Sequence, residues 1–164
     1  MAVTKKPARL LAGVIVVVGI GTLGLILFGR PKEPPSPADA ANPTQVSAGR
    51  VLYAANCASC HGDKLQGQPN WKERKPDGKL PAPPHDETGH TWHHPDQQLF
   101  KIVKLGVGAI VPNYQTDMIS FGNHLSDQDI WDVIAYIKST WPPDIQARQA
   151  EMTRTAAQQE DGHR

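Results

Sequence analysis

The longest run of hydrophobic residues lies near the N-terminus, at residues 10–28, with the sequence LLAGVIVVVGIGTLGLILF. These 19 residues carry no charge. As a helix they would extend about 28 Å, close to the roughly 30 Å thickness of a bilayer's hydrocarbon core. Residues 1–9 include Lys5, Lys6 and Arg9, and basic residues before a span favour a cytoplasmic N-terminus. The pattern predicts a transmembrane anchor at residues 10–28, with everything after it outside the cytoplasm.

Two other interpretations of this segment explain it less well. One is a cleaved signal peptide, because Ala38-Asp39-Ala40 has the small-x-small form of a cleavage site. The apolar run is longer than the about 7 to 15 residues of a signal peptide's core, and the cleavage site lies well downstream of it. The other is a dinucleotide-binding loop, because residues 19–24 are GIGTLG. That motif needs a strand before it and a helix after it, and here a hydrophobic run of membrane-spanning length surrounds it.

Beyond the anchor, the pattern predicts a tether followed by helices. Residues 29–43 contain five prolines, which exclude helix and sheet hydrogen bonding and predict a stiff, extended tether. A first helix follows, because a set of residues recurs at i, i+3, i+4 spacing: Val46, Gly49, Leu52, Tyr53 and Asn56. A second helix is predicted from Pro95-Asp96 to about Leu105, with Gly106 as its stop.

The third predicted helix has the clearest sequence signals. Ser126 is followed three residues later by Asp129, which is close to a capping-box pattern with an acidic first turn. Pro142-Pro143 ends the helix. Its apolar residues fall on one stripe: Ile130, Val133, Ile134, Ile137 and Trp141. Residues 142–164 form a polar C-terminal tail that we expect to fray.

No strand-like alternation persists, so the predicted fold class is all-α: a small domain at residues 44–141 with three to four short helices, preceded by one transmembrane helix. Residues 62–94 show no period and are rich in proline and glycine. A loop of this length inside a compact domain needs something to organise it. We expect that role to fall to a prosthetic group.

Charge and cysteine content exclude two classes of protein. The formal net charge is +1, but residues 1–41 hold five basic and two acidic side chains, so residues 42–164 carry about −2. No basic surface for nucleic acid is predicted. The chain has only two cysteines, which are too few for a disulfide framework.

The two cysteines lie in the motif CASCHG, residues 57–62. A thioredoxin-like redox pair would need a βαβ pattern, which is missing. A zinc site could combine Cys57 and Cys60 with His90 and His94, although 29 residues separate the pairs where about 12 to 15 are usual. C-x-x-C-H is also the signature of covalent haem attachment, with His61 as the iron ligand. The spacing favours haem and leaves zinc open.

A second segment makes the pattern more specific. CASCHG follows GRVLYAAN, and the chain continues later as TDMISFGNHLSDQDIWDVIAYIKSTW. Over about residues 44–141 the chain resembles the bacterial class I mono-haem cytochromes c. The resemblance implies one covalent haem c, bound by Cys57, Cys60, His61 and Met118, with His61 and Met118 as the two iron ligands.

The same resemblance implies two packing contacts. The first and last helices of the domain should cross. At the crossing, Gly49 and Tyr53 of the first helix should pack against residues of the last helix: Trp131, Ile134 and Tyr136. The backbone carbonyl of Pro69 should accept a hydrogen bond from the imidazole of His61.

Several residues have alternative interpretations. Met118 could instead fill a gap in the core, and His124 is a reserve ligand that we expect to be a solvated loop residue. His85, His90, His93 and His94, with Asp86 and Glu87, could bind copper or zinc, but we expect surface residues, some bonding haem propionates or helix ends. Trp71 and Trp92 could contact a propionate or pack within the loop.

One segment of this loop is a basic run, made of Lys72, Arg74, Lys75 and Lys79. It could steer an acidic partner, but Glu73 and Asp77 interrupt it, which favours a solvated surface.

These features predict a membrane-tethered electron carrier that is not itself an enzyme. It would be a single-pass protein of a bacterial inner membrane with its haem domain in the periplasm. Its partners would be redox proteins of a respiratory or photosynthetic chain. Three alternatives stay open: a haem subunit of a larger membrane oxidoreductase, a copper-handling protein that uses loop 85–94, and a peroxidase-like or gas-sensing site with a labile Met118.

Overall fold

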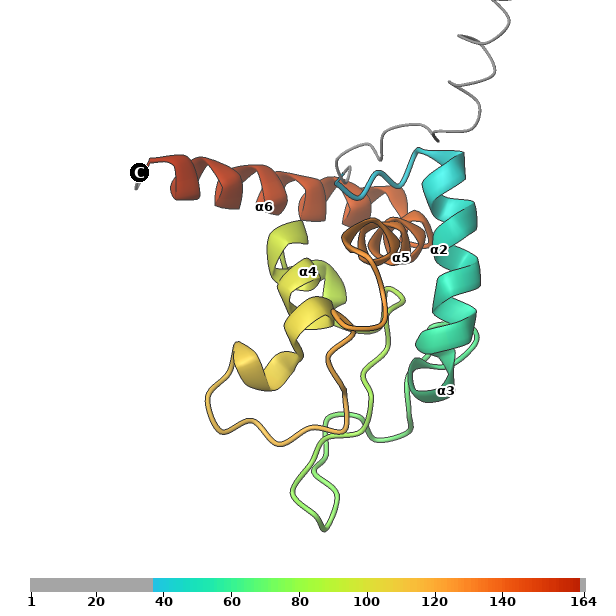
Figure 1. Ribbon diagram of the computed structural model, residues 1–164, viewed down its shortest axis with the longest axis vertical. Helices are drawn as coiled ribbons and strands as arrows, with labels where there is room; N and C mark the ends of the chain where they lie inside the picture. Colours follow the sequence, from blue (N-terminus) through green and yellow to red (C-terminus); the bar gives the residue numbers. More distant parts are fainter. Residues whose placement is uncertain (1–36, 163–164) are drawn as a thin grey trace, which may run out of the picture. The chain divides into compact units, whose positions relative to one another are not determined.

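The computed structural model describes residues 37–162, which form helices and loops without a strand (Figure 1). The predicted anchor at residues 10–28 and most of the tether lie outside this range. Within it, no helix has the length and apolar character to cross a membrane. In chain order the elements are α2 (Pro43–Asn56), α3 (Ala58–His61), η1 (Thr91–His93), α4 (Asp96–Leu105), η2 (Val107–Ala109), α5 (Asp127–Ser139) and α6 (Pro143–Asp161).

The predicted first helix is α2, and it begins where local chemistry favours a start. The side-chain oxygen of Asn42 accepts hydrogen bonds from the backbone N–H groups of Thr44 at 3.0 Å and Gln45 at 3.3 Å. Pro43 occupies the first turn, where its missing N–H costs nothing. The helix runs to Asn56 and delivers the chain directly into the cysteine motif.

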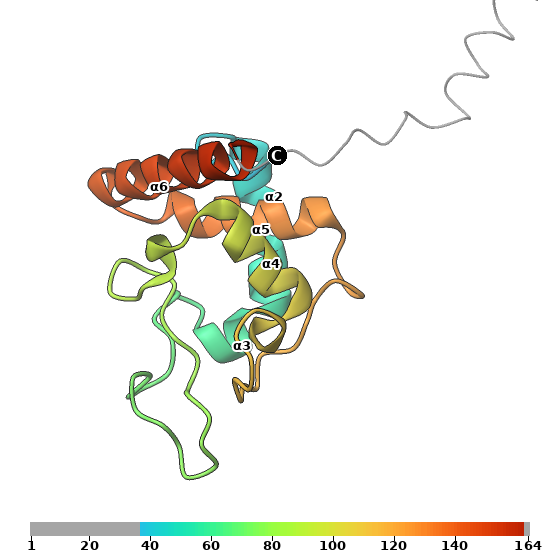
Figure 2. The ribbon, with the colours of Figure 1, turned by 90° about the vertical axis from the view of Figure 1, so that its left-hand side faces the viewer.

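Helix α2 crosses α5 at Gly49 (Figures 1 and 2). A Cβ atom at Gly49 would lie 1.8 Å from the carbonyl oxygen of Asp132 and 2.9 Å from Cβ of Tyr136. Tyr53, one turn later, contacts the Tyr136 ring at a centroid distance of 5.5 Å. The expected crossing is therefore present at Gly49, Tyr53 and Tyr136.

The other two expected partners at this crossing face a different cluster. Trp131 and Ile134 pack with Leu99 of α4, and the Trp131 ring stacks on Phe100 at 4.3 Å. Tyr53 of α2 instead shares a cluster with Val133 and Ile137 of α5 and with Trp141, which follows α5. Helix α5 is thus buried on two sides, so its single predicted stripe serves two groups of neighbours.

The capping box predicted for α5 is confirmed. The Asp129 N–H donates to Ser126 Oγ at 3.2 Å, and the Ser126 N–H donates to Asp129 Oδ2 at 2.8 Å. Helix α4 also ends as predicted, because Gly106 adopts a φ of 82° that is unfavourable for residues with a side chain. Both boundaries are set by residues within one turn of the helix end.

The expectation of a frayed C-terminal tail is wrong, because residues 143–161 form the 19-residue helix α6. Gln149 on this helix is fully buried. Its side-chain N–H groups donate to Asp96 Oδ1 at 2.7 Å and to the His94 carbonyl at 3.1 Å. Polar contacts hold this helix in place, and they leave no apolar periodicity in the sequence.

A buried ion pair lies beside this contact. Lys138 Nζ of α5 is 2.6 Å from Asp96 Oδ2 of α4, and their side chains are only 12% and 9% exposed. Lys138 also donates to the Ala38 carbonyl at 3.3 Å. Asp96 therefore links α4, α5 and α6, and its two carboxylate oxygens each have a buried partner.

Replacing Lys138 with methionine leaves the Asp96 carboxylate buried with no cation, so we expect the free energy of unfolding to fall by about 3 to 5 kcal/mol. Chemical denaturation measures this loss. Lys101→Met is the matched control, because its Glu160 partner is 3.9 Å away and exposed, and it should cost less than about 1 kcal/mol. Equal losses in the two variants would contradict the buried pair.

Replacing Gly49 with alanine forces its Cβ into the Asp132 backbone, so the two helices must separate. We expect a loss of about 3 kcal/mol in the free energy of unfolding. Gly162→Ala is the control, since its nearest atom is the Gln158 oxygen at 3.4 Å, and its denaturation midpoint should stay unchanged. A wild-type midpoint in Gly49→Ala would refute the close crossing.

Candidate functional site

The cysteine motif forms one tight turn at the end of α2. Cys57 is the C-cap of α2 and also the N-cap of α3. Its carbonyl accepts hydrogen bonds from the N–H groups of Cys60 at 3.1 Å and His61 at 2.9 Å. Gly62 ends the turn with a φ of 83°. The structure thus brings Cys57, Cys60 and His61 together on a single helical turn.

Both thiols are free; that of Cys57 is half-buried and that of Cys60 is exposed. Burial, with a smaller contribution from Cys60, raises the pKa of the Cys57 thiol to about 11. A thiol of this kind is protonated at neutral pH and is a poor redox nucleophile. This agrees with the exclusion of a thioredoxin-like pair.

The zinc interpretation is not supported. Among residues 37–162 no group of three or more His, Cys, Asp or Glu side chains is placed to hold a metal ion. His90 instead stacks on Trp71 at 5.5 Å, and His94 packs edge-on against His90 at 5.4 Å. These histidines therefore do not form a site with the cysteines. The described part of the 85–94 loop likewise holds no group of three such side chains for copper.

His61 is buried, and its ring is held in one orientation. Its Nδ1 lies 2.8 Å from the carbonyl oxygen of Pro83 and donates a proton to it. Burial lowers the pKa of His61, and the hydrogen bond opposes that shift. Because Nδ1 carries the proton, Nε2 keeps its lone pair, and no hydrogen-bond partner for Nε2 is found in the described part of the chain.

The prediction that Pro69 accepts this hydrogen bond is wrong, since Pro83 does. The chain leaves the site at Gln68 and returns at Ala82, where the Gln68 N–H donates to the Ala82 carbonyl at 2.9 Å. Gly67 has a φ of 68°, and a Cβ there would lie 2.5 Å from the Pro84 nitrogen. Residues 69–81 are therefore an excursion, which we call the 69–81 loop.

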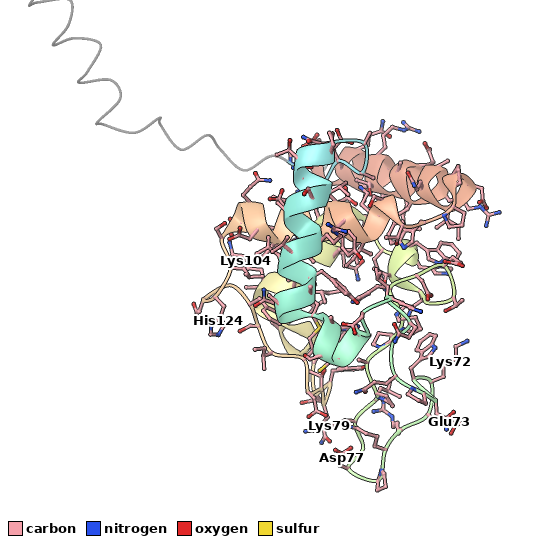
Figure 3. The ribbon with its side chains drawn as sticks, turned by 90° about the vertical axis from the view of Figure 1, so that its right-hand side faces the viewer. Lys72, Glu73, Asp77, Lys79, Lys104 and His124 are labelled. Atoms are coloured by element: carbon pink, nitrogen blue, oxygen red, sulfur yellow. The ribbon has the colours of Figure 1, made fainter. Side chains whose placement is uncertain are left out.

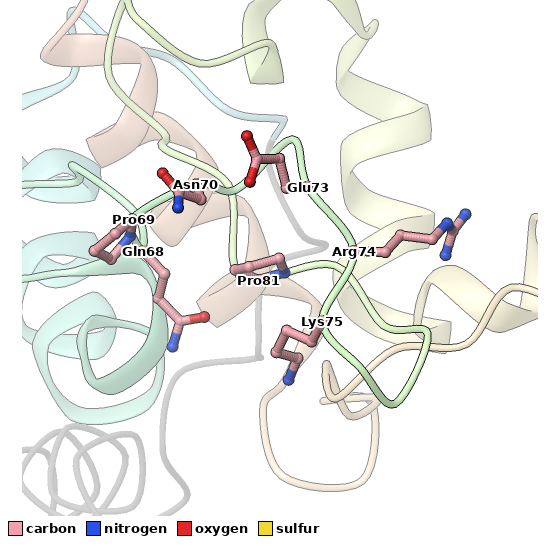
Figure 4. A pocket seen from close by; sticks show the side chains of 7 residues that line it. All are labelled: Gln68, Pro69, Asn70, Glu73, Arg74, Lys75 and Pro81. Carbon is pink, nitrogen blue, oxygen red and sulfur yellow. The ribbon is translucent and has the colours of Figure 1, made fainter.

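Pro69 lies at the base of this loop, beside a shallow surface pocket (Figure 4). The pocket is lined by Gln68, Pro69, Asn70, Glu73, Arg74, Lys75 and Pro81. Neither cysteine nor His61 nor Met118 borders it. The pocket belongs to the loop and does not form part of the candidate site.

His85 is not the surface residue that we expected. It is partly buried, and its ring stacks on the His61 ring with a centroid distance of 4.0 Å and an interplanar angle of 23°. Its Nδ1 is 2.8 Å from Thr91 Oγ1. Burial, and then the nearby charges of His61 and His90, hold the pKa of His85 well below its usual value. No pattern in the sequence indicates this contact.

Tyr53 also contributes to the site. Its hydroxyl donates to the Gly62 carbonyl at 3.0 Å, directly after His61. Burial is the main cause that raises its pKa, followed by Cys57. The sequence placed Tyr53 only at the helix crossing, and the structure shows that it also fixes the end of the cysteine turn.

The remaining members of the histidine cluster pack within the loop. His93 stacks on Trp92 at 3.7 Å, and the Trp92 Nε1–H donates to the Glu87 carbonyl at 3.3 Å. Trp71 stacks on His90 and carries Lys72 over its face at 4.9 Å. These contacts support the interpretation of Trp71 and Trp92 as loop-packing residues.

Met118 lies in the loop between η2 and α5. In Figures 1 and 2 that loop and α3 are both on the side of α5 opposite to α6. The side chain of Met118 is half-buried, and its N–H donates to Thr116 Oγ1 at 3.0 Å. The role of Met118 as a ligand stays a prediction. His124 is exposed near the start of α5 (Figure 3), as expected for a solvated loop residue.

Basic side chains of the run form bonds within the protein. Lys75 Nζ is 2.7 Å from Asp117 Oδ2, and Lys79 pairs with the other oxygen of Asp117. Arg74 donates to the Gly78 carbonyl at 2.6 Å. These pairs tie the 69–81 loop to the residue before Met118; Figure 3 shows Lys79 and Asp77 on that loop. They also lower the pKa of the Asp117 carboxyl to about 2.

The donor set fits covalent haem. Two free thiols one helical turn apart can form two thioether bonds. The adjacent imidazole has its Nδ1 occupied by Pro83 and its Nε2 lone pair available for iron. The pattern recognised in the sequence is therefore preserved in three dimensions.

Comparison with known proteins agrees with this chemistry. Residues 46–141, more than half of the chain, match the sequence model of the family described as cytochrome c. Searches of the curated proteins and of the solved structures returned no match. The chain therefore belongs to the cytochrome c family, whose members use a c-type haem for electron transfer.

Proposed function

We propose that this protein is a one-electron carrier with one haem c, attached through Cys57 and Cys60 and ligated by His61 and Met118. One observation carries the proposal: the cysteine turn presents two free thiols beside an imidazole whose Nδ1 is bound to Pro83. When bound, the haem supplies an iron that alternates between the ferrous and ferric states.

The protein's own groups adapt that iron to electron transfer. The hydrogen bond from His61 Nδ1 to Pro83 fixes the imidazole plane and makes Nε2 a stronger donor. A thioether ligand from Met118 would raise the reduction potential relative to a second imidazole. Ligation by both His61 and Met118 would leave no iron position open to a substrate, which favours an electron carrier over a peroxidase-like or gas-sensing site.

The proposal includes a membrane location. Residues 10–28 have the length and hydrophobicity of a membrane span. The tether predicted at residues 29–43 would end before Ala38, because Ala38 packs in the core and Pro43 already belongs to α2. Anchoring raises the effective concentration of the haem domain near membrane partners. We place the domain in the periplasm of a bacterial inner membrane, between redox proteins of a respiratory or photosynthetic chain.

The central experiment is a pyridine haemochrome spectrum together with the intact mass of protein extracted from membranes of a maturation-competent host. One haem c per chain and a mass that includes residues 1–36 would support both parts of the proposal. Colourless protein with the mass of its polypeptide alone would overturn it. Sizing after extraction in mild detergent separates a lone carrier from a subunit of a larger oxidoreductase.

Replacing Cys57 or Cys60 with alanine removes one thioether bond, so each variant should retain at most a single covalent link and give a poor yield of holoprotein. Haem staining after denaturing electrophoresis, with intact mass, measures this. Ser59→Ala is the control, because Ser59 lies between the cysteines and is exposed. It should retain all of its haem, and full retention in both cysteine variants would contradict attachment at this turn.

Met118→Ala should keep the haem attached but open the iron to added ligands. We expect the sulfur-to-iron charge-transfer band of the ferric protein to disappear, and added imidazole or cyanide to bind where the wild type resists it. Met152→Ala in α6 is the control and should match the wild type. A ferric spectrum unchanged by Met118→Ala would show that another residue is the sixth ligand.

A further inference from the structure

We propose that His85 is a positioning residue for His61: its ring holds the plane of the His61 imidazole and shields the hydrogen bond from His61 to Pro83. This inference rests on the proposed function, because it matters only where His61 ligates the haem iron. It concerns a histidine to which the cysteine motif assigns no role.

The contact itself is close and nearly parallel. The centroids of His61 and His85 are 4.0 Å apart with 23° between their planes. The ring of His85 therefore covers one face of His61. The edge of His61 is held separately by the Pro83 carbonyl, 2.8 Å from Nδ1. One short backbone segment thus supplies both an edge contact and a face contact to the same imidazole.

The backbone of His85 is fixed from two directions. Its N–H donates to the Leu65 carbonyl at 2.7 Å. Its carbonyl accepts a hydrogen bond from Trp141 Nε1 at 2.7 Å. Trp141 is only 2% exposed and follows α5 directly, and Leu65 is 5% exposed. The position of His85 is therefore tied to a core helix as well as to its own loop.

The side chain of His85 is fixed as well. Thr91 Oγ1 lies 2.8 Å from its Nδ1 and 3.4 Å from the Pro84 carbonyl. Since a carbonyl only accepts, the Thr91 hydroxyl donates to Pro84 and accepts from the His85 Nδ1–H. This anchor sets the rotation of the ring. An aliphatic side chain has neither a flat ring to stack on His61 nor a group that bonds to Thr91.

This arrangement has a direct consequence for the iron ligand. The partners of a ligating imidazole set both its orientation and its donor strength. If the His85 ring is removed, one face of His61 loses its packing, and water gains access to the Nδ1–H that bonds Pro83. The hydrogen bond should then open more often, and the imidazole plane should move relative to the haem.

The experiment compares His85→Leu with His85→Phe in the holoprotein. Leucine removes the flat ring, whereas phenylalanine retains a flat ring that can stack on His61. The first readout is hydrogen exchange of the His61 Nδ1–H in the ferrous protein, followed by nuclear magnetic resonance. The second is the pattern of haem-methyl shifts in the ferric protein, which reports the orientation of the imidazole plane. His93→Leu is the matched control, because His93 is exposed and stacks on Trp92.

In His85→Leu we expect the Nδ1–H to exchange about 10-fold faster, as for a local opening, and the methyl-shift pattern to change. His85→Phe keeps a ring but loses its bond to Thr91, so its exchange rate should lie between those of the wild type and His85→Leu, and His93→Leu should match the wild type in both readouts. The amide of Ile134 in α5 serves as an internal reference. Its exchange should stay constant, because a general loss of stability would speed both sites together.

Unchanged exchange and methyl shifts in His85→Leu would overturn the inference, and so would equal acceleration of the Ile134 amide. If His85→Leu yields no folded protein, Thr91→Val decides, because it removes the anchor of the ring and leaves the ring present. Faster Nδ1–H exchange in that variant supports the inference, and wild-type exchange refutes it. A wild-type protein without haem, or without His61 ligation, defeats the proposed function itself.

Discussion

The close crossing of α2 and α5 at Gly49 is the constraint on which the candidate site depends. With no side chain at this position, the backbone of α2 reaches the Asp132 carbonyl of α5, where a Cβ would lie 1.8 Å away. Helix α2 ends in the cysteine turn, and α5 ends beside Trp141. The crossing therefore sets the separation between the turn that carries His61 and the indole that holds His85.

The long loop after the cysteine turn is organised by contacts to both sides of the site. Pro83 and His85 contact His61 from the segment in which the loop returns to the site, residues 82–85. Lys75 and Lys79, on the 69–81 loop, bind Asp117 beside Met118. Exposed ion pairs of this kind contribute little stability individually, but two cations on one carboxylate give the loop a defined attachment. The residues on either side of the proposed haem are thus supported by the same segment.

The C-terminal helix shows a second way of holding a polar segment against a core. Helix α6 has few apolar residues, and it is held by Gln149, which reaches the buried pair of Asp96 and Lys138. A buried carboxylate needs every oxygen satisfied, so the helix that supplies the amide completes an otherwise costly site.

The sequence by itself determined the features that depend on residues within one helical turn. The spacing of Cys57, Cys60 and His61, the capping box of Ser126 with Asp129, and the stop at Gly106 were all predicted, because each rests on contacts between near neighbours in the chain. Periodicity also located α2 and α5, and the proline start and glycine stop located α4. Only the tertiary structure decided the contacts between distant segments: Pro83 in place of Pro69, the stacking of His85 on His61, and the docking of α6 through Gln149. These contacts join residues 22 to 53 positions apart, and they depend on how the loop closes and which polar groups are buried, which no local pattern encodes.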